Sequence, residues 1–198
     1  MPHEGTHGSI ATIKDRLRLA AKVSESMADA GAASIAAAAD LIAGCFRRSG
    51  KLLLCGNGGS AADCQHMAAE LVGRLTRETI RPGLPAIALT TDTSFLTAYA
   101  NDVGFDDVFA RQVQALGVTG DVLLAISTSG SSRNVLAAAE EARRKGLSVV
   151  ALLGEDGPLA QAADVTIRVP TRDTQLIQQV HVAVEHLICH LVERALHP

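Results

Sequence analysis

The sequence is poor in aromatic residues and in excess charge, and each shortage excludes a class of function. Aromatic residues make up 3% of the 198 residues and tryptophan is absent, so we expect no row of stacking platforms for single-stranded nucleic acid. The formal net charge of −3 gives no general attraction to nucleic acid or to anionic membranes. We therefore expect neither a nucleic-acid partner nor a membrane partner.

Long hydrophobic runs and cysteine motifs are also missing. No apolar run reaches the about 18 residues of a membrane-spanning helix, and we expect no signal peptide. Cys45, Cys55, Cys64 and Cys189 form no C-x-x-C motif and lie in apolar or helical segments. We predict reduced core thiols and a cytoplasmic protein.

Five short apolar runs are present, and helical patterns separate most of them. The runs cover residues 52–55, 86–89, 122–126, 147–153 and 165–169. Most of them do not alternate apolar with polar residues, which is typical of strands buried on both faces of a parallel sheet. The sequence therefore predicts an α/β fold in which a five-stranded, doubly wound parallel sheet is the middle of three layers.

Two helical patterns precede the first strand. Apolar residues recur at helical spacing from Ser9, Gly31 marks a break, and an alanine-rich segment continues to about Arg48. One sheet does not need both helices, so we expect them to pack on the domain and against another subunit. The predicted division is a flexible tail at 1–8, packing and oligomerisation helices at 9–50, and an α/β domain at 51–198.

The segment Lys51–Arg74, KLLLCGNGGSAADCQHMAAELVGR, holds the densest set of candidate functional residues. An apolar strand leads into a glycine-rich turn, Gly56 to Gly59, and then into a helix for which Ser60 is the predicted N-cap. Glycines let the backbone approach a ligand closely, and the helix dipole favours negative charge at this end. The pattern predicts a cradle for phosphate.

A second loop of this kind follows the third strand, where Ser127 to Ser132 supply five hydroxyl groups and one glycine ahead of a helix. Hydroxyl and amide donors together suit phosphate oxygens. Ordinary helix capping also favours serine and threonine at such positions. Two loops at the carboxyl ends of parallel strands, where open α/β sheets bind ligands, favour phosphate binding over capping alone.

A dinucleotide site is the competing interpretation of the glycine turn. Gly56-x-Gly58-x-x-Ala61 fits the G-x-G-x-x-G/A fingerprint, and Asp92 ends the second strand where a ribose-binding carboxylate could lie. However, Asp92 is further along the chain than the usual ~20 residues, and a nicotinamide site has no evident use for the serine-rich loop. We therefore favour a phosphate site.

Two helices carry residues suited to metal binding or proton transfer. His66 and Glu70 are at i and i+4, about 40° apart around a helix, and so share one face. Gln178 and His186 lie about two turns apart on one broad face of the last helix. If that helix packs beside the first loop, two imidazoles, a carboxylate and an amide oxygen converge, a set that suits zinc or acid–base chemistry near neutral pH.

Each of these pairs alone is more simply explained as ordinary surface or core side chains without a chemical role. The last helix carries two further histidines, His181 and His190. We expect those two to be core or rim residues without a chemical role.

The motifs in combination resemble the sugar isomerase (SIS) family. They are LLLCGNGGSAADCQHMAAELVGR, LTTDTS, AND, DVLLAISTSGSS and IQQVHVAVEH, and the resemblance covers nearly the whole chain. It implies a flavodoxin-like sheet and a homotetramer with active sites between subunits. It further implies an aldose–ketose isomerase acting on a sugar phosphate, which converts sedoheptulose 7-phosphate to D-glycero-D-manno-heptose 7-phosphate through an enediol for lipopolysaccharide or capsule precursors.

The resemblance also implies a role for each site residue. Substrate contacts fall on Asn57, Gly58, Gly59, Glu70, Arg74, Asn101, Asp102, Ser127, Thr128, Ser129, Ser132 and Gln178, with the serine-rich loop holding the phosphate. The implied ligands of a zinc ion are His66, Glu70, Gln178 and His186, and the implied catalytic acid/base residues are Glu70 and His186. The family often has Asn where this chain has Ser131.

A non-catalytic relative in the same family, an adaptor that binds the replication initiator DnaA, is the alternative. Its pattern lacks the carboxylate at the position of Glu70 and the histidine at that of His186. Both residues are present here, which favours the enzyme.

Overall fold

Five parallel strands form the central sheet of the computed structural model, which describes residues 4–77 and 80–197. They are β1 (Leu52–Gly56), β2 (Ala86–Ala88), β3 (Val122–Ser127), β4 (Ser148–Leu153) and β5 (Val165–Arg168), in the order β2-β1-β3-β4-β5. This is the flavodoxin-like order, as predicted. The chain passes from β1 to one edge and returns on the other side of β1 as β3, so the strand order reverses between β1 and β3.

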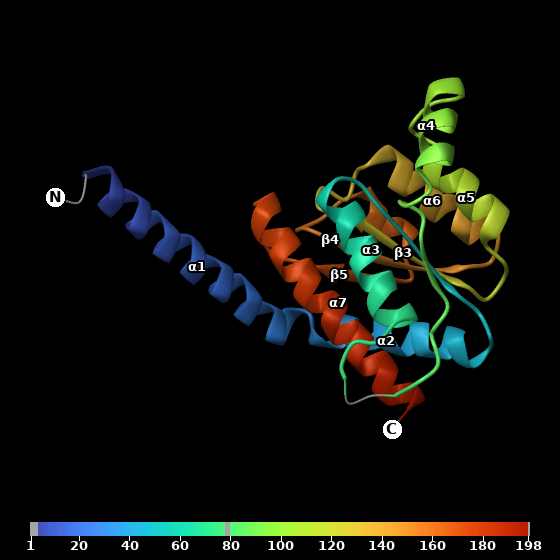
Figure 1. Cartoon of the computed structure of the whole chain (residues 1–198), viewed down its shortest axis with the longest axis horizontal. Helices are drawn as coiled ribbons and strands as arrows, with labels where there is room; N and C mark the ends of the chain where they lie inside the picture. Colours follow the sequence, from blue (N-terminus) through green and yellow to red (C-terminus); the bar gives the residue numbers. More distant parts are fainter. Residues whose placement is uncertain (1–3, 78–79, 198) are drawn as a thin grey trace.

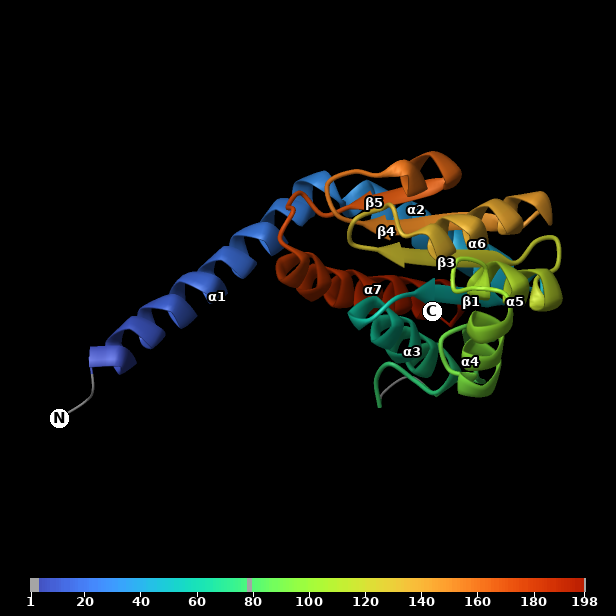
Figure 2. The same ribbon diagram turned by 90° about the horizontal axis from the view of Figure 1, so that it is seen from above.

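Helices cover both faces of this sheet (Figures 1 and 2). One face packs against α2 (Ala32–Arg47), α3 (Gly59–Val72) and α7 (Thr174–Leu196), and the other against α5 (Val108–Leu116), α6 (Arg133–Arg144) and the 3-10 helix η1 (Pro158–Ala162). Along β1, Leu52 and Leu54 contact the first layer while Leu53 and Cys55 contact the second, and all four are fully buried. The predicted three-layer architecture is confirmed.

Helix α1 (Glu4–Ala30) extends away from the body of the molecule (Figure 1). Residues 4–8, predicted as part of a flexible tail, are helical, whereas residues 1–3 of that tail lie outside the described residues. The axes of α1 and α2 differ by 70° across the break at Gly31. Within the described chain no single helix is long and apolar enough to cross a membrane; only this bent pair passes that test, by length and composition.

The glycine turn after β1 differs from the prediction in its helix start. Helix α3 begins at Gly59 with Gly58 as its N-cap, so the prediction of Ser60 as the cap was wrong. Gly58 has a φ of 56°, which side chains other than glycine rarely allow, and it turns the chain into the helix early. Ser60 consequently lies inside the first turn, 3% exposed.

Other element ends follow their expected signals or shift by a few residues. Asp173 caps α7 by accepting from the N–H groups of Gln175 and Leu176, and Gly146, with a φ of 78°, ends α6. From the sequence pattern alone, Asn101 and Asp102 would be placed in a loop and the next helix would start at Phe105. In the structure these two residues are the end of α4 (Thr93–Asp102), and α5 starts at Val108.

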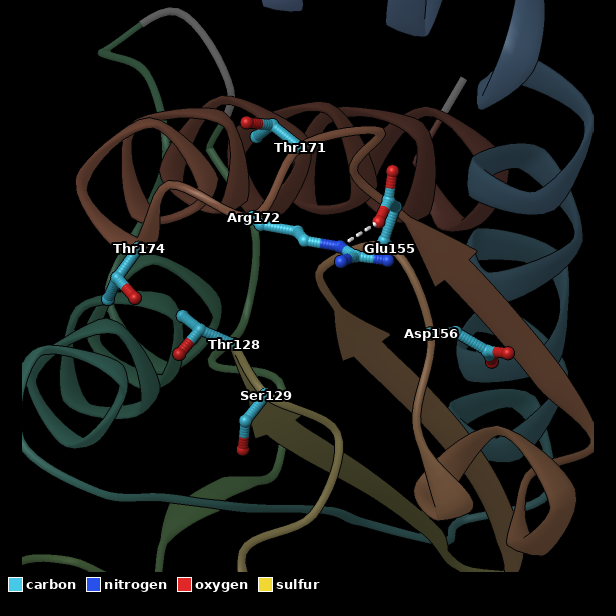
Figure 3. Close-up of a pocket in the computed structure, with 7 residues that line it drawn as sticks. All are labelled: Thr128, Ser129, Glu155, Asp156, Thr171, Arg172 and Thr174. Atoms are coloured by element: carbon cyan, nitrogen blue, oxygen red, sulfur yellow. Dashed lines mark hydrogen bonds and ion pairs between the residues drawn. The ribbon is translucent and has the colours of Figure 1, made fainter.

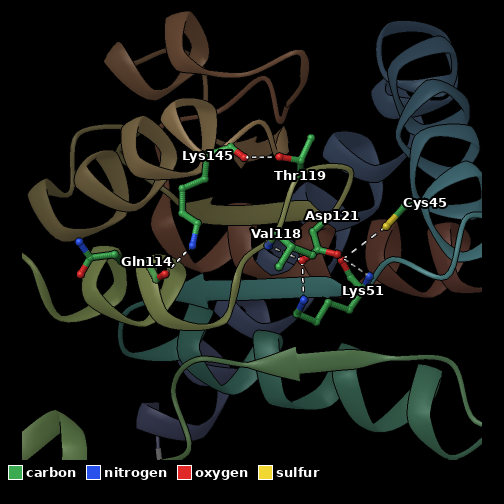
Figure 4. Close-up of polar contacts among 7 residues, drawn as sticks. All are labelled: Cys45, Lys51, Gln114, Val118, Thr119, Asp121 and Lys145. Carbon is green, nitrogen blue, oxygen red and sulfur yellow. Dashed lines mark hydrogen bonds and ion pairs between the residues drawn. The ribbon is translucent and has the colours of Figure 1, made fainter.

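A polar network holds the amino ends of β1 and β3 together (Figure 4). The carboxylate of Asp121, 1% exposed, accepts hydrogen bonds from the backbone N–H groups of Lys51 and Val118, both at 2.9 Å, and pairs with Nζ of Lys51 at 2.6 Å. The Sγ–H of Cys45 donates to the Lys51 carbonyl at 3.5 Å. This edge is opposite to the loops with anion-binding patterns, so the network is a structural one.

Candidate active site

Helices α3 and α7 run parallel, side by side and in register (Figures 1 and 2). The side-chain amide of Gln178 packs on Gly59, His186 meets His66, and Glu193 accepts from the N–H of Leu75 just beyond α3. These partners are separated by 118 to 120 residues in every case. The last helix therefore packs beside the first loop and its helix, as the convergence of the two predicted pairs requires.

This register brings His66, Glu70 and His186 together. The Nε2 atoms of the two histidines are 2.8 Å apart, and Oε1 of Glu70 is 3.9 Å from Nε2 of His66. Ligand atoms of all three residues lie within 4.8 Å of one another. Ligand atoms of a tetrahedral zinc ion are about 3.4 Å apart, so the three groups fit such an ion after a small adjustment. The side chains of His66 and Glu70 are 41% and 21% exposed, which leaves one side open.

Gln178, the fourth predicted ligand, lies two turns before His186, about 12 Å along the helix axis. A Cβ atom on Gly59 would come within 2.3 Å of the Gln178 Nε2, so the glycine makes room for the amide. Gln178 also lines a cavity of ≈460 Å³ with Asp63 and Gln175. Its place among the metal ligands stays a prediction.

The hydroxyl groups of the serine-rich loop converge. Ser127 Oγ lies 3.0 Å from Ser132 Oγ and 3.4 Å from Ser129 Oγ, and Ser131 donates to Ser129 at 3.0 Å. Ser132 occupies the N-cap position of α6 but makes no side-chain capping bond. The N–H groups at this helix N-terminus are therefore available to an anion, next to the paired hydroxyls of Ser127 and Ser132.

A cavity of ≈350 Å³ opens beside this loop (Figure 3). Thr128 and Ser129 line one side of it, and Thr174 at the start of α7 lies next to them. The guanidinium of Arg172 crosses the cavity and pairs with Glu155 at 2.5 Å. The serine-rich loop and the amino end of α7 thus border the same space.

An amide pair that the sequence analysis missed joins the two anion loops. Asn57 and Asn134 exchange two side-chain hydrogen bonds of 2.8 and 2.9 Å, and Asn134 is 3% exposed. Asn57 follows β1 and Asn134 is the second residue of α6 after β3, so the pair spans the point where strand order reverses. In the sequence, Asn134 was simply one more polar residue at a helix start.

Three predicted substrate contacts lie apart from these groups. Arg74 is exposed after α3, and Asn101 and Asp102 are exposed at the end of α4, where they bond to each other at 2.8 Å. Among the described residues, no hydrogen bond or ion pair joins them to the histidine cluster or the serine loop. Asp92, the candidate ribose ligand of the dinucleotide interpretation, caps α4 through the N–H of Phe95.

Two buried acids beside the cluster were also missed. Glu185, 1% exposed, has no hydrogen-bond partner for either oxygen, and Oδ2 of Asp63 is likewise unpaired. Burial, reinforced by the nearby charge of Asp63, raises the pKa of Glu185 to about 9, and burial also raises the pKa of Asp63. The sequence signal that could have identified Glu185 is its position on the apolar stripe of the last helix.

The other two histidines of α7 lie where they were predicted, one in the core and one at the rim. His181 is fully buried, with Nε2 3.3 Å from the Leu153 carbonyl, and burial lowers its pKa to about 4. His190 is exposed at the rim of an apolar groove. Neither belongs to the cluster.

Comparison with known proteins agrees with this geometry. The chain matches the SIS domain over residues 17–154. A phosphoheptose isomerase of Rhodospirillum rubrum is 57% identical over 83% of this chain and 87% of that protein, and one of Roseiflexus is 51% identical over 92% of each. The structure of a phosphoheptose isomerase from Francisella tularensis superposes with a TM-score of 0.90 at 38% identity, over 94% of this chain and 98% of that one. The structure of the phosphoheptose isomerase from Neisseria gonorrhoeae gives a TM-score of 0.85 at 41% identity, over 96% of this chain and 99% of that one.

The fold is that of a SIS domain protein, and its named relatives are isomerases. Because the identity extends along most of both chains, the chain belongs to the phosphoheptose isomerase family. The comparisons support neither the initiator-binding adaptor nor the dinucleotide site. The SIS match begins at residue 17, within the segment assigned to packing helices, so the predicted domain boundary at residue 51 stays a prediction.

The buried carboxyl of Glu185 predicts a pH-dependent stability. The ordinary pKa of a glutamate is 4.5, and that of Glu185 in the folded protein is about 9. Between these two pH values the folded protein binds one more proton than the unfolded chain, so the free energy of unfolding falls as pH rises. The slope is at most about 1.4 kcal/mol per pH unit. We expect Glu185→Gln to flatten this decline and to melt at least about 3 °C above the wild type at pH 8.5.

Thermal melts in EDTA at pH 5 to 9 measure this effect without metal binding. Glu140→Gln, at an exposed glutamate of α6, is the matched control and should keep the wild-type slope. An unchanged slope in Glu185→Gln would contradict the assignment.

Proposed function

We propose that the protein converts sedoheptulose 7-phosphate to D-glycero-D-manno-heptose 7-phosphate and so supplies heptose for lipopolysaccharide or capsule precursors. The observation that carries this proposal is the meeting of Glu70 with His186 on two parallel helices that begin beside the anion loops. The relatives named phosphoheptose isomerase support the same reaction.

The length of the substrate suits this arrangement. Seven residues, about 10 Å along α3, separate Gly59 at the glycine turn from His66 in the cluster. From C1 to phosphorus an open-chain heptose 7-phosphate has eight bonds, also about 10 Å at roughly 1.2 Å per bond. A phosphate held at the loops therefore lets C1 and C2 reach the cluster.

The isomerisation moves two protons. One leaves C1 of the ketose and returns at C2, while another leaves the C1 hydroxyl and is gained by the C2 oxygen. Glu70 is the proposed base for the carbon proton and His186 its partner for the oxygens, and each such transfer contributes typically 10²–10⁴-fold. The two side chains come from different helices, so they can act on different sides of the carbon chain.

A zinc ion in this site would be held by His66, Glu70, Gln178 and His186. It would supply polarisation of the substrate carbonyl. Binding to a metal weakens a carboxylate as a base, so Glu70 has to balance the two roles. The three clustered groups support the proposal through their close approach and their mix of imidazole and carboxylate.

The phosphate is proposed to rest on Ser127, Thr128, Ser129 and Ser132. Three converging hydroxyls and a helix N-terminus offer donors to its oxygens without a cluster of cations. This suits a chain whose net charge is −3.

We also propose a homotetramer with sites between subunits. Ile10, Ile13 and Leu17 on the projecting α1 are 45–67% exposed, and an apolar groove of ≈350 Å³ lies where α1, α2 and α7 meet. Such surfaces are typical of subunit contacts. A cytoplasmic location is proposed because all four cysteines are buried free thiols.

Steady-state kinetics with sedoheptulose 7-phosphate should separate chemistry from binding. We expect Glu70→Gln and His186→Gln to lower kcat by at least about 10²-fold. Ser132→Ala should raise KM about tenfold, because it removes a hydroxyl donor to a charged phosphate, and Ser131→Ala is its matched control. Equal effects of the two serine variants, or a fully active Glu70→Gln, would refute these roles.

Metal content provides a second test. The purified protein should bind one zinc ion per chain, lose activity on chelation and regain it with zinc. We expect His66→Ala to lose the metal, whereas His190→Ala, one turn after His186 on α7 but outside the cluster, should retain it. A chelated protein with undiminished activity would show that zinc is not required.

Light scattering tests the assembly. The wild type should have four times the 20.6 kDa chain mass. Joint Ile13→Asp and Leu17→Asp changes should reduce this mass, whereas Ile80→Asp, at a 94% exposed loop residue, should not. A monomeric wild type with full activity would contradict the proposal.

A further inference from the structure

The carboxyl end of α3 is completed by a residue from a distant part of the following loop. The last four carbonyl groups of a helix have no partner within it. In α3, the Ala69 carbonyl accepts from the N–H of Gly73 at 2.8 Å. The next two carbonyls, those of Glu70 and Leu71, accept from Nη2 and Nη1 of Arg81 at 2.9 and 2.8 Å. Arg81 therefore caps the turn that carries the proposed catalytic base.

The Arg81 guanidinium is anchored at the same time to α7. Its Nε and Nη2 donate to Oε1 of Glu193 at 2.7 and 2.5 Å, and the side chains are 0% and 4% exposed. The same Glu193 oxygen accepts from the N–H of Leu75 at 3.3 Å, next to Arg74. Glu193 lies seven residues, about 10 Å, beyond His186 on α7. One buried group thus joins the backbone of Glu70 to the helix of His186.

Stability alone does not account for this arrangement. A buried ion pair is on average no better for stability than well-packed apolar side chains, because desolvation offsets the attraction. What a planar, five-donor guanidinium adds is fixed direction, since it bonds a carboxylate and two carbonyls simultaneously. A misplacement of about 1 Å at a reacting group can cost about 10²-fold in rate.

We propose that Arg81, anchored by Glu193, is a positioning residue that sets the place of Glu70 relative to His186. Among the residues that the structure describes, no hydrogen bond or ion pair joins its guanidinium to the side chains of the cluster. Arg81 acts by holding the carbonyl groups of the last turn of α3 at a fixed place beside α7. This inference rests on the proposed isomerase function, because it assigns a role within that same site.

Arg81→Lys is the informative variant. An ammonium keeps the charge but lacks the rigid fork that reaches Glu193 and both carbonyls together. We expect kcat to fall about tenfold to 10²-fold, with KM changed less than about threefold, because the phosphate loops are untouched. We also expect the imidazole NMR signals of His66 and His186 to move.

Lys51→Met provides the matched control. It breaks the Lys51–Asp121 pair, which is another largely buried ion pair but lies at the opposite edge of the sheet. It should lower the melting temperature while leaving kcat and the imidazole signals as in the wild type. Glu193→Gln, which keeps an acceptor but removes the charge, replaces Arg81→Lys if the latter does not fold, and should change kcat in the same direction.

The outcomes separate three cases. Loss of kcat with retained KM and shifted imidazole signals supports the positioning role. A folded Arg81→Lys or Glu193→Gln that merely melts earlier, as Lys51→Met does, overturns it. If the wild type does not isomerise the heptose phosphate, the proposed function fails, and the positioning role is then judged from the imidazole NMR signals alone. Signals that move in Arg81→Lys support the positioning role, and unchanged signals overturn it.

Discussion

The parallel register of α3 and α7 is the constraint on which the proposed site depends. Both helices start at the carboxyl edge of the sheet and run back along one face, so residues at similar distances from that edge meet. Gln178 meets Gly59 and His186 meets His66. A slip of one turn, about 5.4 Å, would separate the imidazoles and leave Glu70 facing a different part of α7. The proposed substrate binding at the strand ends and the proposed proton transfer along the helices are thus geometrically linked.

The seam between these helices contains groups that a purely stabilising core would avoid. Glu185 and Asp63 are buried with unpaired oxygens, while Arg81 and Glu193 form an ion pair out of contact with water. Buried polar groups of this kind cost stability or contribute little to it. Their position along the seam that carries His66 and His186 fits a site in which the placement of charged groups matters as well as packing.

The architecture could be predicted from the sequence because the patterns that determine its strands and helices are local. Strands buried on both faces read as unbroken apolar runs, and His66 and Glu70 share a helix face by spacing alone. The register of α7 against α3 is tertiary, so Asn134, Glu185 and the capping role of Arg81 had no local signal strong enough to single them out. The Ser60 cap was mispredicted because the positive φ of Gly58 starts the helix two residues earlier than serine preference suggests.

The most direct test of the account follows the carbon-bound proton. Sedoheptulose 7-phosphate is incubated with the protein in D₂O and the mixture is observed by NMR. The account predicts that deuterium enters at C1 and C2 as the aldose appears, and that Glu70→Gln abolishes this exchange. Exchange at the wild-type rate in Glu70→Gln would contradict the claim that the meeting of α3 and α7 places Glu70 as the base.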